Sequence, residues 1–147
     1  MRRIDFLSSP FLKEENLLFD HEIGTDYLCS NIALVSELTK RKCPKLHKEL
    51  SPLVEKVYHL NGSIRGKLAI DEEDLSSLYE SYKGIKEKLH HKIEGMVLPG
   101  GCEIACRLHI LRCEAIKVVR TMHKIKNSGI DVPDILFDYG NLLSNYF

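Results

Sequence analysis

The feature that most constrains the fold is the stretch from Met96 to Arg120, MVLPGGCEIACRLHILRCEAIKVVR. It begins with a loop, because Pro99 fixes its own φ and Gly100-Gly101 adopts positive φ without strain. A long helix follows, to about Asn127, in which apolar residues recur on nearly every side. We expect this helix to be the most buried one of a helical assembly, with the charge of Arg112 paired.

Four further segments show the period of an amphipathic helix. The first spans about 20–41, and the second begins at Ser51-Pro52 or earlier, near Leu46. The third runs from an acidic start at 70–74 to about Ile93, and the last runs from Pro133 to Tyr146. The sequence therefore predicts an all-α five-helix bundle, with an irregular arm at 1–16 and a single domain at 17–147.

The composition narrows the class of protein. The 21 basic and 21 acidic residues balance, so we expect no basic surface that would bind nucleic acid or an anionic membrane. No apolar run approaches the roughly 18–20 residues that span a bilayer, and the first residues do not form a signal peptide. Five cysteines without a paired C-x-x-C motif are typical of a reducing compartment. We therefore expect a cytoplasmic protein with small-molecule ligands.

Three segments together resemble the PduO-type ATP:cob(I)alamin adenosyltransferases. The sequence L-P-G-G at 98–101, followed by Leu108-His109 and Arg112, is similar to that family's L-P-G-G and L-H-x-x-R motifs. Ile23–Ser30 resembles its G-T-V-D-E-L-N-S motif, and Tyr139–Tyr146 its Y-L-N-R-L-S-D-Y motif. The resemblance covers about residues 17–147 and implies a homotrimer of helical bundles with active sites between subunits.

The resemblance also implies a reaction and its ligands. Family members transfer the 5′-deoxyadenosyl group of ATP, bound with Mg²⁺, to the cobalt of a reduced cobalamin. Asp26 and Arg112 fall on positions that form a salt bridge across the subunit interface beside the corrinoid. Lysine would not reproduce the bidentate geometry of the arginine. The alternative is that the two residues form an ion pair that serves only the architecture.

Four other positions match ligand-binding positions of the family. Met96 stands where an aromatic residue presses on the lower face of the corrin. Lys117, Arg120 and Asn141 fall on residues of the nucleotide site, although Lys117 replaces an arginine. A lone Asn, Arg or Lys on a helix is also commonly a solvated or capping residue. The resemblance therefore implies these residues as candidates for binding ATP and the corrinoid.

The chain departs from the family pattern at the nucleotide site. Residues 1–16 contain no glycine, so the T-G-D-x-G loop that holds the ATP phosphates is absent. The family's R-R-A-E-R reads I-K-V-V-R here, which places Ile116 at an arginine position and Val119 at a glutamate position. Two hypotheses stay open: a divergent adenosyltransferase, and a trimeric homologue that binds a corrinoid or another ligand without ATP chemistry.

One stripe of the central helix has the composition of a metal site. It consists of Cys102, Cys106, His109 and Cys113. Four ligands spread over about three turns of one helix cannot close on a single tetrahedral ion. We therefore expect these side chains to pack in a helix interface and to bind no metal, and we identify no catalytic nucleophile or acid–base pair.

Overall fold

The computed structural model describes residues 4–92 and 95–147. Within these residues there are five α-helices, one short 3₁₀ turn and no strand, so the predicted all-α fold is confirmed. The turn is Ile4–Phe6, and the helices are α1 (Leu18–Lys42), α2 (Pro44–Gly62), α3 (Glu72–Leu89), α4 (Glu103–Asn127) and α5 (Asp134–Tyr146). None of the described helices is long and apolar enough to cross a membrane.

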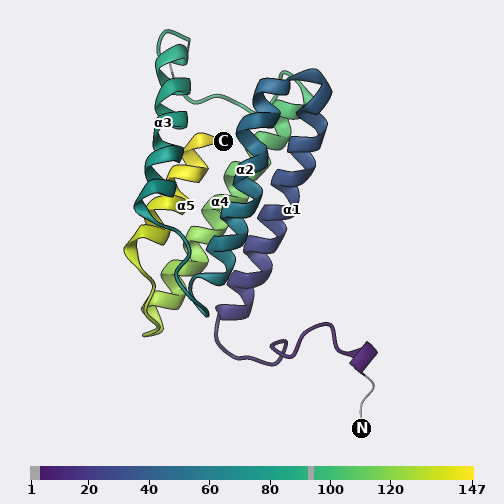
Figure 1. Cartoon of the computed structure of the whole chain (residues 1–147), viewed down its shortest axis with the longest axis vertical. Helices are drawn as coiled ribbons and strands as arrows, with labels where there is room; N and C mark the ends of the chain where they lie inside the picture. Colours follow the sequence, from purple (N-terminus) through teal and green to yellow (C-terminus); the bar gives the residue numbers. More distant parts are fainter. Residues whose placement is uncertain (1–3, 93–94) are drawn as a thin grey trace.

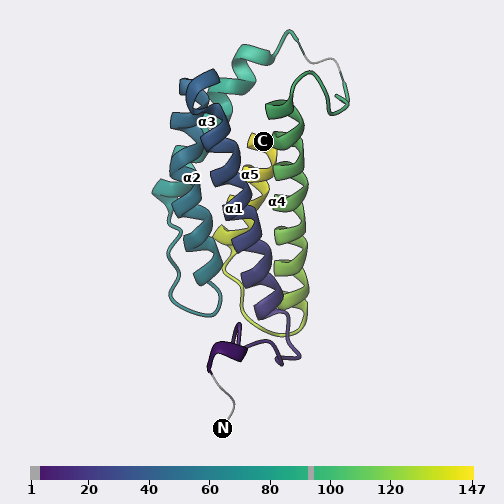
Figure 2. The same ribbon diagram turned by 90° about the vertical axis from the view of Figure 1, so that its right-hand side faces the viewer.

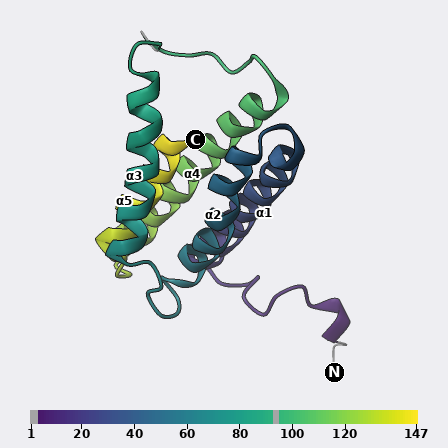
Figure 3. The same ribbon diagram turned by 45° about the horizontal axis from the view of Figure 1, so that its top comes forward.

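The helices pack in the spatial order α2, α1, α4, α5, α3 (Figures 1 and 2). Neighbours in this order pack against each other, and α1 and α2 form a hairpin closed by a short turn at Cys43. The arm before α1 extends away from the lower end of the bundle, and the loop from α3 to α4 crosses its upper end (Figure 3).

The core consists of aliphatic side chains that all five helices direct inwards. Leu28 and Ile32 of α1, Leu111 of α4 and Leu143 of α5 are completely buried. Each fully buried aliphatic side chain contributes about 1.5–3 kcal/mol, and so this core holds the bundle together without a disulfide bond. The other completely buried aliphatic side chains are Leu50, Val57, Leu60, Met122, Ile125 and Leu136.

The start of α2 differs from the main prediction. The helix begins at Pro44 rather than at Ser51-Pro52, close to the alternative start near Leu46. Pro44 occupies the first helical position, where a missing N–H costs nothing, whereas Pro52 lies inside the helix on its exposed side. The apolar residues on both sides of Pro52 bury one continuous face, and this burial outweighs the lost hydrogen bond.

The ends of α3 follow from its local sequence. Asp71 caps the helix, because its Oδ1 accepts a hydrogen bond of 2.9 Å from the N–H of Asp74, and Asp74 Oδ2 accepts one of 3.2 Å from the N–H of Asp71. The helix ends at Leu89, earlier than predicted, and Ile93 lies outside the described residues.

The prediction that the central helix is the most buried one is wrong for the single chain. Six residues of α4 are buried, compared with seven of α1. The buried residues of α4 lie on one face, while Ile110 and Ile116 on the other side are 51% and 37% exposed. The apolar pattern on nearly all sides therefore reflects one face in the core together with Ile110 and Ile116, which lie among charged residues on the exposed side. The predicted glycine at its end is present, since Gly129 has φ +95°.

Gly140 marks the closest approach of α5 to α4. A Cβ placed there would lie 2.8 Å from Cγ2 of Val119 and 3.3 Å from Cε of Met122. We expect Gly140→Ala to destabilise the protein by about 1 kcal/mol, because overpacking exceeds the gain in helix propensity. Gly84→Ala is the matched control and should stabilise by up to about 1 kcal/mol, since nothing lies within 4 Å. Thermal unfolding that shows both variants equally stabilised would contradict the close approach.

Candidate functional site

The outer surface of α1 and α4 carries large apolar side chains that one chain leaves exposed. They lie on two adjacent helices, which pack where a Cβ placed at Gly24 of α1 would lie 3.9 Å from Cγ2 of Val118 of α4. Exposed apolar residues in one contiguous area are typical of an interaction surface. We call this area the α1–α4 face, and its apolar members, which are 37–56% exposed, are Ile23, Tyr27, Leu34, Ile110 and Ile116.

Asp26 lies at the edge of this face that borders α2. It shares a side of α1 with Glu22 and Cys29, at positions i−4 and i+3. The Glu22 carbonyl accepts a hydrogen bond of 2.6 Å from Asn61, and the Cys29 thiol donates one of 3.2 Å to the Val54 carbonyl. Both partners belong to α2, so the exposed Asp26 carboxylate stands beside the α1–α2 seam.

Arg112 lies at the opposite edge, which borders α5. It shares a side of α4 with Val119, which contacts Gly140, and with His123, whose ring centroid lies 4.4 Å from that of Phe137. Among the described residues, neither Arg112 nor Asp26 has an ion-pair partner within 4.0 Å. A single chain thus presents the two candidate partners on different edges of one face.

The three residues that are candidates for binding the nucleotide lie at similar heights along the bundle. Lys117 is exposed and pairs with Glu114 at 2.9 Å, and this hydrogen bond raises the pKa of the lysine. Arg120 is also exposed, one turn further along α4. Because α5 runs antiparallel to α4 and Gly140 packs against Val119, Asn141 is level with Val118, between Lys117 and Arg120 along the bundle. Asn141 itself lines a shallow groove between α3 and α5. None of the hydrogen bonds between described side chains joins Asn141 to either cation.

Met96 lies on the loop between α3 and α4. Its side chain is 98% exposed, and those of Val97 and Leu98 are 66% and 82% exposed. The loop turns into the helix through Gly101, whose φ is +86°, as its glycine-rich sequence predicts. Cys102 caps α4 by accepting a hydrogen bond of 3.4 Å from the N–H of Ala105. The loop thus holds three apolar side chains in solvent at one end of the bundle.

Comparison with known proteins decides the family. The model of the cobalamin adenosyltransferase family matches residues 21–147, which include most of α1 and all of α2 to α5. The chain belongs to this family. A corrinoid and ATP are the substrates that the family name implies. No match was found among curated proteins.

The cysteine stripe of this adenosyltransferase homologue lies partly at the surface. Cys102 is exposed, while Cys106, His109 and Cys113 are half-buried along α4. The packing expected for Cys102 is therefore wrong, because this residue caps the helix instead. Within residues 4–92 and 95–147, no three His, Cys, Asp or Glu side chains are grouped so that they could hold a metal ion.

An ion-pair cluster that the sequence did not predict anchors the N-terminal arm. Arg65, between α2 and α3, binds both carboxylate oxygens of Glu14 at 2.7 and 2.8 Å and also pairs with Glu22 of α1. Its guanidinium lies 4.3 Å from the centroid of the Phe11 ring. Hydrogen bonding to Arg65 lowers the pKa of Glu14. The cluster holds Phe11 and Glu14 of the glycine-free arm close to the start of α1, where the family motif would supply a phosphate-binding loop.

Proposed function

We propose that this chain is an ATP:corrinoid adenosyltransferase that acts as a homotrimer with active sites between subunits. The observation that carries the proposal is the match to the family over residues 21–147, together with a surface suited to self-association. The α1–α4 face exposes five large apolar side chains, and it carries Asp26 on one edge and Arg112 on the other. A cyclic head-to-tail assembly brings different edges of neighbouring copies together, so Asp26 of one subunit meets Arg112 of the next.

The proposed reaction needs orientation more than acid–base chemistry. The cobalt of the reduced corrinoid attacks C5′ of ATP with its own electron pair, the Co–C bond forms, and triphosphate leaves with the electrons of the broken C–O bond. Lys117 and Arg120 supply positive charge for the triphosphate, and Asn141 at the same level supplies a hydrogen bond to the nucleotide. Met96 and its apolar neighbours cover the lower corrin face, which keeps water away from the cobalt.

The N-terminal arm favours a second candidate function. Its residues 4–16 lack the glycines whose backbone N–H groups would surround a triphosphate, and its Glu14 carboxylate is held by Arg65. A trimer that binds a corrinoid without ATP chemistry fits this arm better. Titration calorimetry with cob(II)alamin and, separately, with ATP·Mg distinguishes the two functions. Corrinoid binding without any ATP binding would favour the second.

A turnover assay tests the role of Arg120. The purified protein is mixed with reduced cobalamin and ATP·Mg, and adenosylcobalamin is followed by its absorbance. We expect Arg120→Ala to lower kcat/KM for ATP by about tenfold, which corresponds to about 1.4 kcal/mol of lost phosphate binding. Lys124→Ala removes an exposed cation one turn further along α4 and should change kcat/KM by less than about twofold. Equal losses in both variants would mean that only net charge matters.

A further inference from the structure

The bundle contains a cavity that the proposed reaction does not use. The short helix α5 has 13 residues and packs against α4, which has 25, so about half of α4 has no α5 beside it. In Figure 1 the C-terminal end of α5 lies well below the upper ends of α3 and α4. Beyond it, a cavity of about 600 Å³ opens between α2, α3 and α4. This volume is within the range of small-molecule sites.

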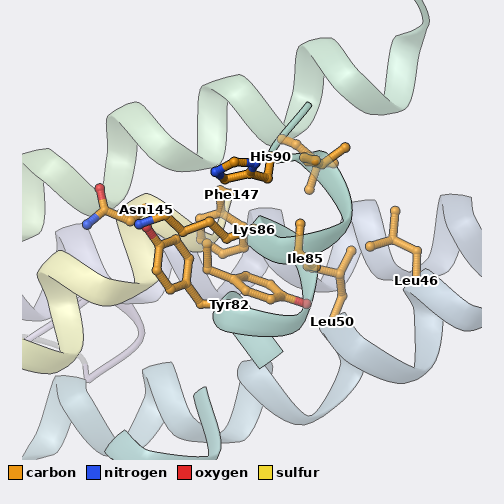
Figure 4. Close-up of a pocket in the computed structure, with 11 residues that line it drawn as sticks. Leu46, Leu50, Tyr82, Ile85, Lys86, His90, Asn145 and Phe147 are labelled. Carbon is orange, nitrogen blue, oxygen red and sulfur yellow. The ribbon is translucent and has the colours of Figure 1, made fainter. Parts of the chain in front are cut away.

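The lining of the cavity is mostly apolar. Two leucines of α2, Leu46 and Leu50, form one side, and Figure 4 shows them across the cavity from Asn145. Helices α2 and α3 contribute residues three or four positions apart, as expected for faces turned towards a common space, while α4 contributes Leu108 and the end of the chain contributes Asn145 to Phe147. Such a lining favours an aliphatic chain over a nucleotide, whose ribose and phosphates would lose their hydrogen bonds with water there. The remaining apolar and aromatic lining residues are Tyr82, Ile85, Leu89, Leu108, Tyr146 and Phe147.

A positive charge lies at the edge of the cavity. Lys86 and His90, one turn apart on α3, line it together with Asn145 of α5 (Figure 4). The Lys86 ammonium lies 5.6 Å from the centroid of the Tyr82 ring. None of the lining side chains is acidic, and among the described residues no carboxylate lies within ion-pair distance of Lys86. The cavity thus combines an apolar interior with one cationic group at its edge.

We propose that this cavity binds an amphipathic monocarboxylate, with its aliphatic chain among the leucines and its carboxylate on Lys86. Asn145 donates a second hydrogen bond to the carboxylate, and His90 adds positive charge when it is protonated. The cavity lies within one chain, and none of the residues proposed to contact the corrinoid or ATP lines it. Asp26, Arg112, Lys117 and Arg120 lie on α1 and α4, Met96 lies on the loop before α4, and Asn141 lines a different groove between α3 and α5. The cavity is therefore a second ligand site, independent of adenosyl transfer.

Titration calorimetry with octanoate, decanoate and dodecanoate below their micelle concentrations tests this proposal. We expect affinity to rise roughly fourfold for each added methylene, as burial of the chain requires. Decanol should bind more weakly than decanoate. Lys86→Gln should weaken decanoate binding about tenfold, while Lys83→Gln, a change at an exposed lysine of the same helix outside the cavity, should leave it unchanged.

Cavity filling supplies the second variant. Leu89→Trp should abolish decanoate binding, with helicity checked by circular dichroism. The Lys86→Gln result stands alone if the tryptophan variant does not fold. The proposal is overturned if decanoate does not bind at millimolar concentration, or if its affinity is the same in the wild type and in Lys86→Gln. Competitive displacement of decanoate by cob(II)alamin would also overturn it, because the cavity would then be part of the corrinoid site.

Discussion

Arg112→Ala is expected to convert the trimer largely to monomers at micromolar concentration. In the proposed assembly the guanidinium is buried between subunits against Asp26, so its removal leaves a buried carboxylate without a partner. The cost of breaking a buried pair in this way is about 3–5 kcal/mol. At about 1.4 kcal/mol per tenfold change, each interface weakens by at least about a hundredfold. Sedimentation velocity over a concentration series measures the effect.

A double-mutant cycle shows whether the two residues meet. Asp26→Ala combined with Arg112→Ala removes the orphaned charge, so the double change should cost less than the sum of the single changes. Arg107→Ala is the matched control, because Arg107 already pairs with Glu103 of its own helix at 2.8 Å and should weaken assembly little. If the effects of the two single changes add up to the effect of the double change within about 0.5 kcal/mol, the pair does not form.

Local sequence signals predicted most of the fold. The helical period predicts all five helices, and the helix ends that have a capping residue or a terminal glycine in the sequence agree with the structure. Asp71 and the acids that follow it start α3, and Gly129 ends α4 with positive φ. The prediction that α2 starts at Ser51-Pro52 is wrong, although a proline after a serine is typical of a helix start. The helix continues past Pro52 because burial of the continuous apolar face of α2 stabilises it.

The candidate site was predicted less completely, because it depends on contacts between distant segments. Arg65, Glu14 and Glu22 meet only in the folded chain, and no spacing in the sequence connects them. The exposed side of α4 is mostly charged, but Ile110 and Ile116 also lie on it, and their apolar character made the helix look buried on nearly all sides. The cavity beyond α5 was not predicted either, because it follows from the different lengths of helices that pack side by side.

His21 is a buried histidine with one unsatisfied ring nitrogen. It is 1% exposed, its Nε2 donates a hydrogen bond of 3.2 Å to the Leu60 carbonyl, and Nδ1 has no partner within the described part of the chain. Protonation would place a new donor on Nδ1 where no acceptor is available. Burial lowers the pKa of His21, and the bond to Leu60 and the charge of Glu22 oppose this shift only in part.

Acidification should therefore destabilise the protein in a defined window. The unfolded chain binds a proton at His21 below about pH 6.5, and the folded chain does so only at lower pH, so stability is complete above this value and falls as the pH decreases. The slope that this single group contributes stays below about 1.4 kcal/mol per pH unit, and the free energy of unfolding decreases from pH 7 to pH 5. Denaturant unfolding at fixed protein concentration measures this loss.

His21→Gln keeps a donor for the Leu60 carbonyl but does not titrate, so its free energy of unfolding should be nearly constant from pH 7 to pH 5. His91→Gln, at an exposed histidine, should behave like the wild type. A wild-type free energy of unfolding that stays constant from pH 7 to 5 would show that the buried imidazole accepts its proton without cost.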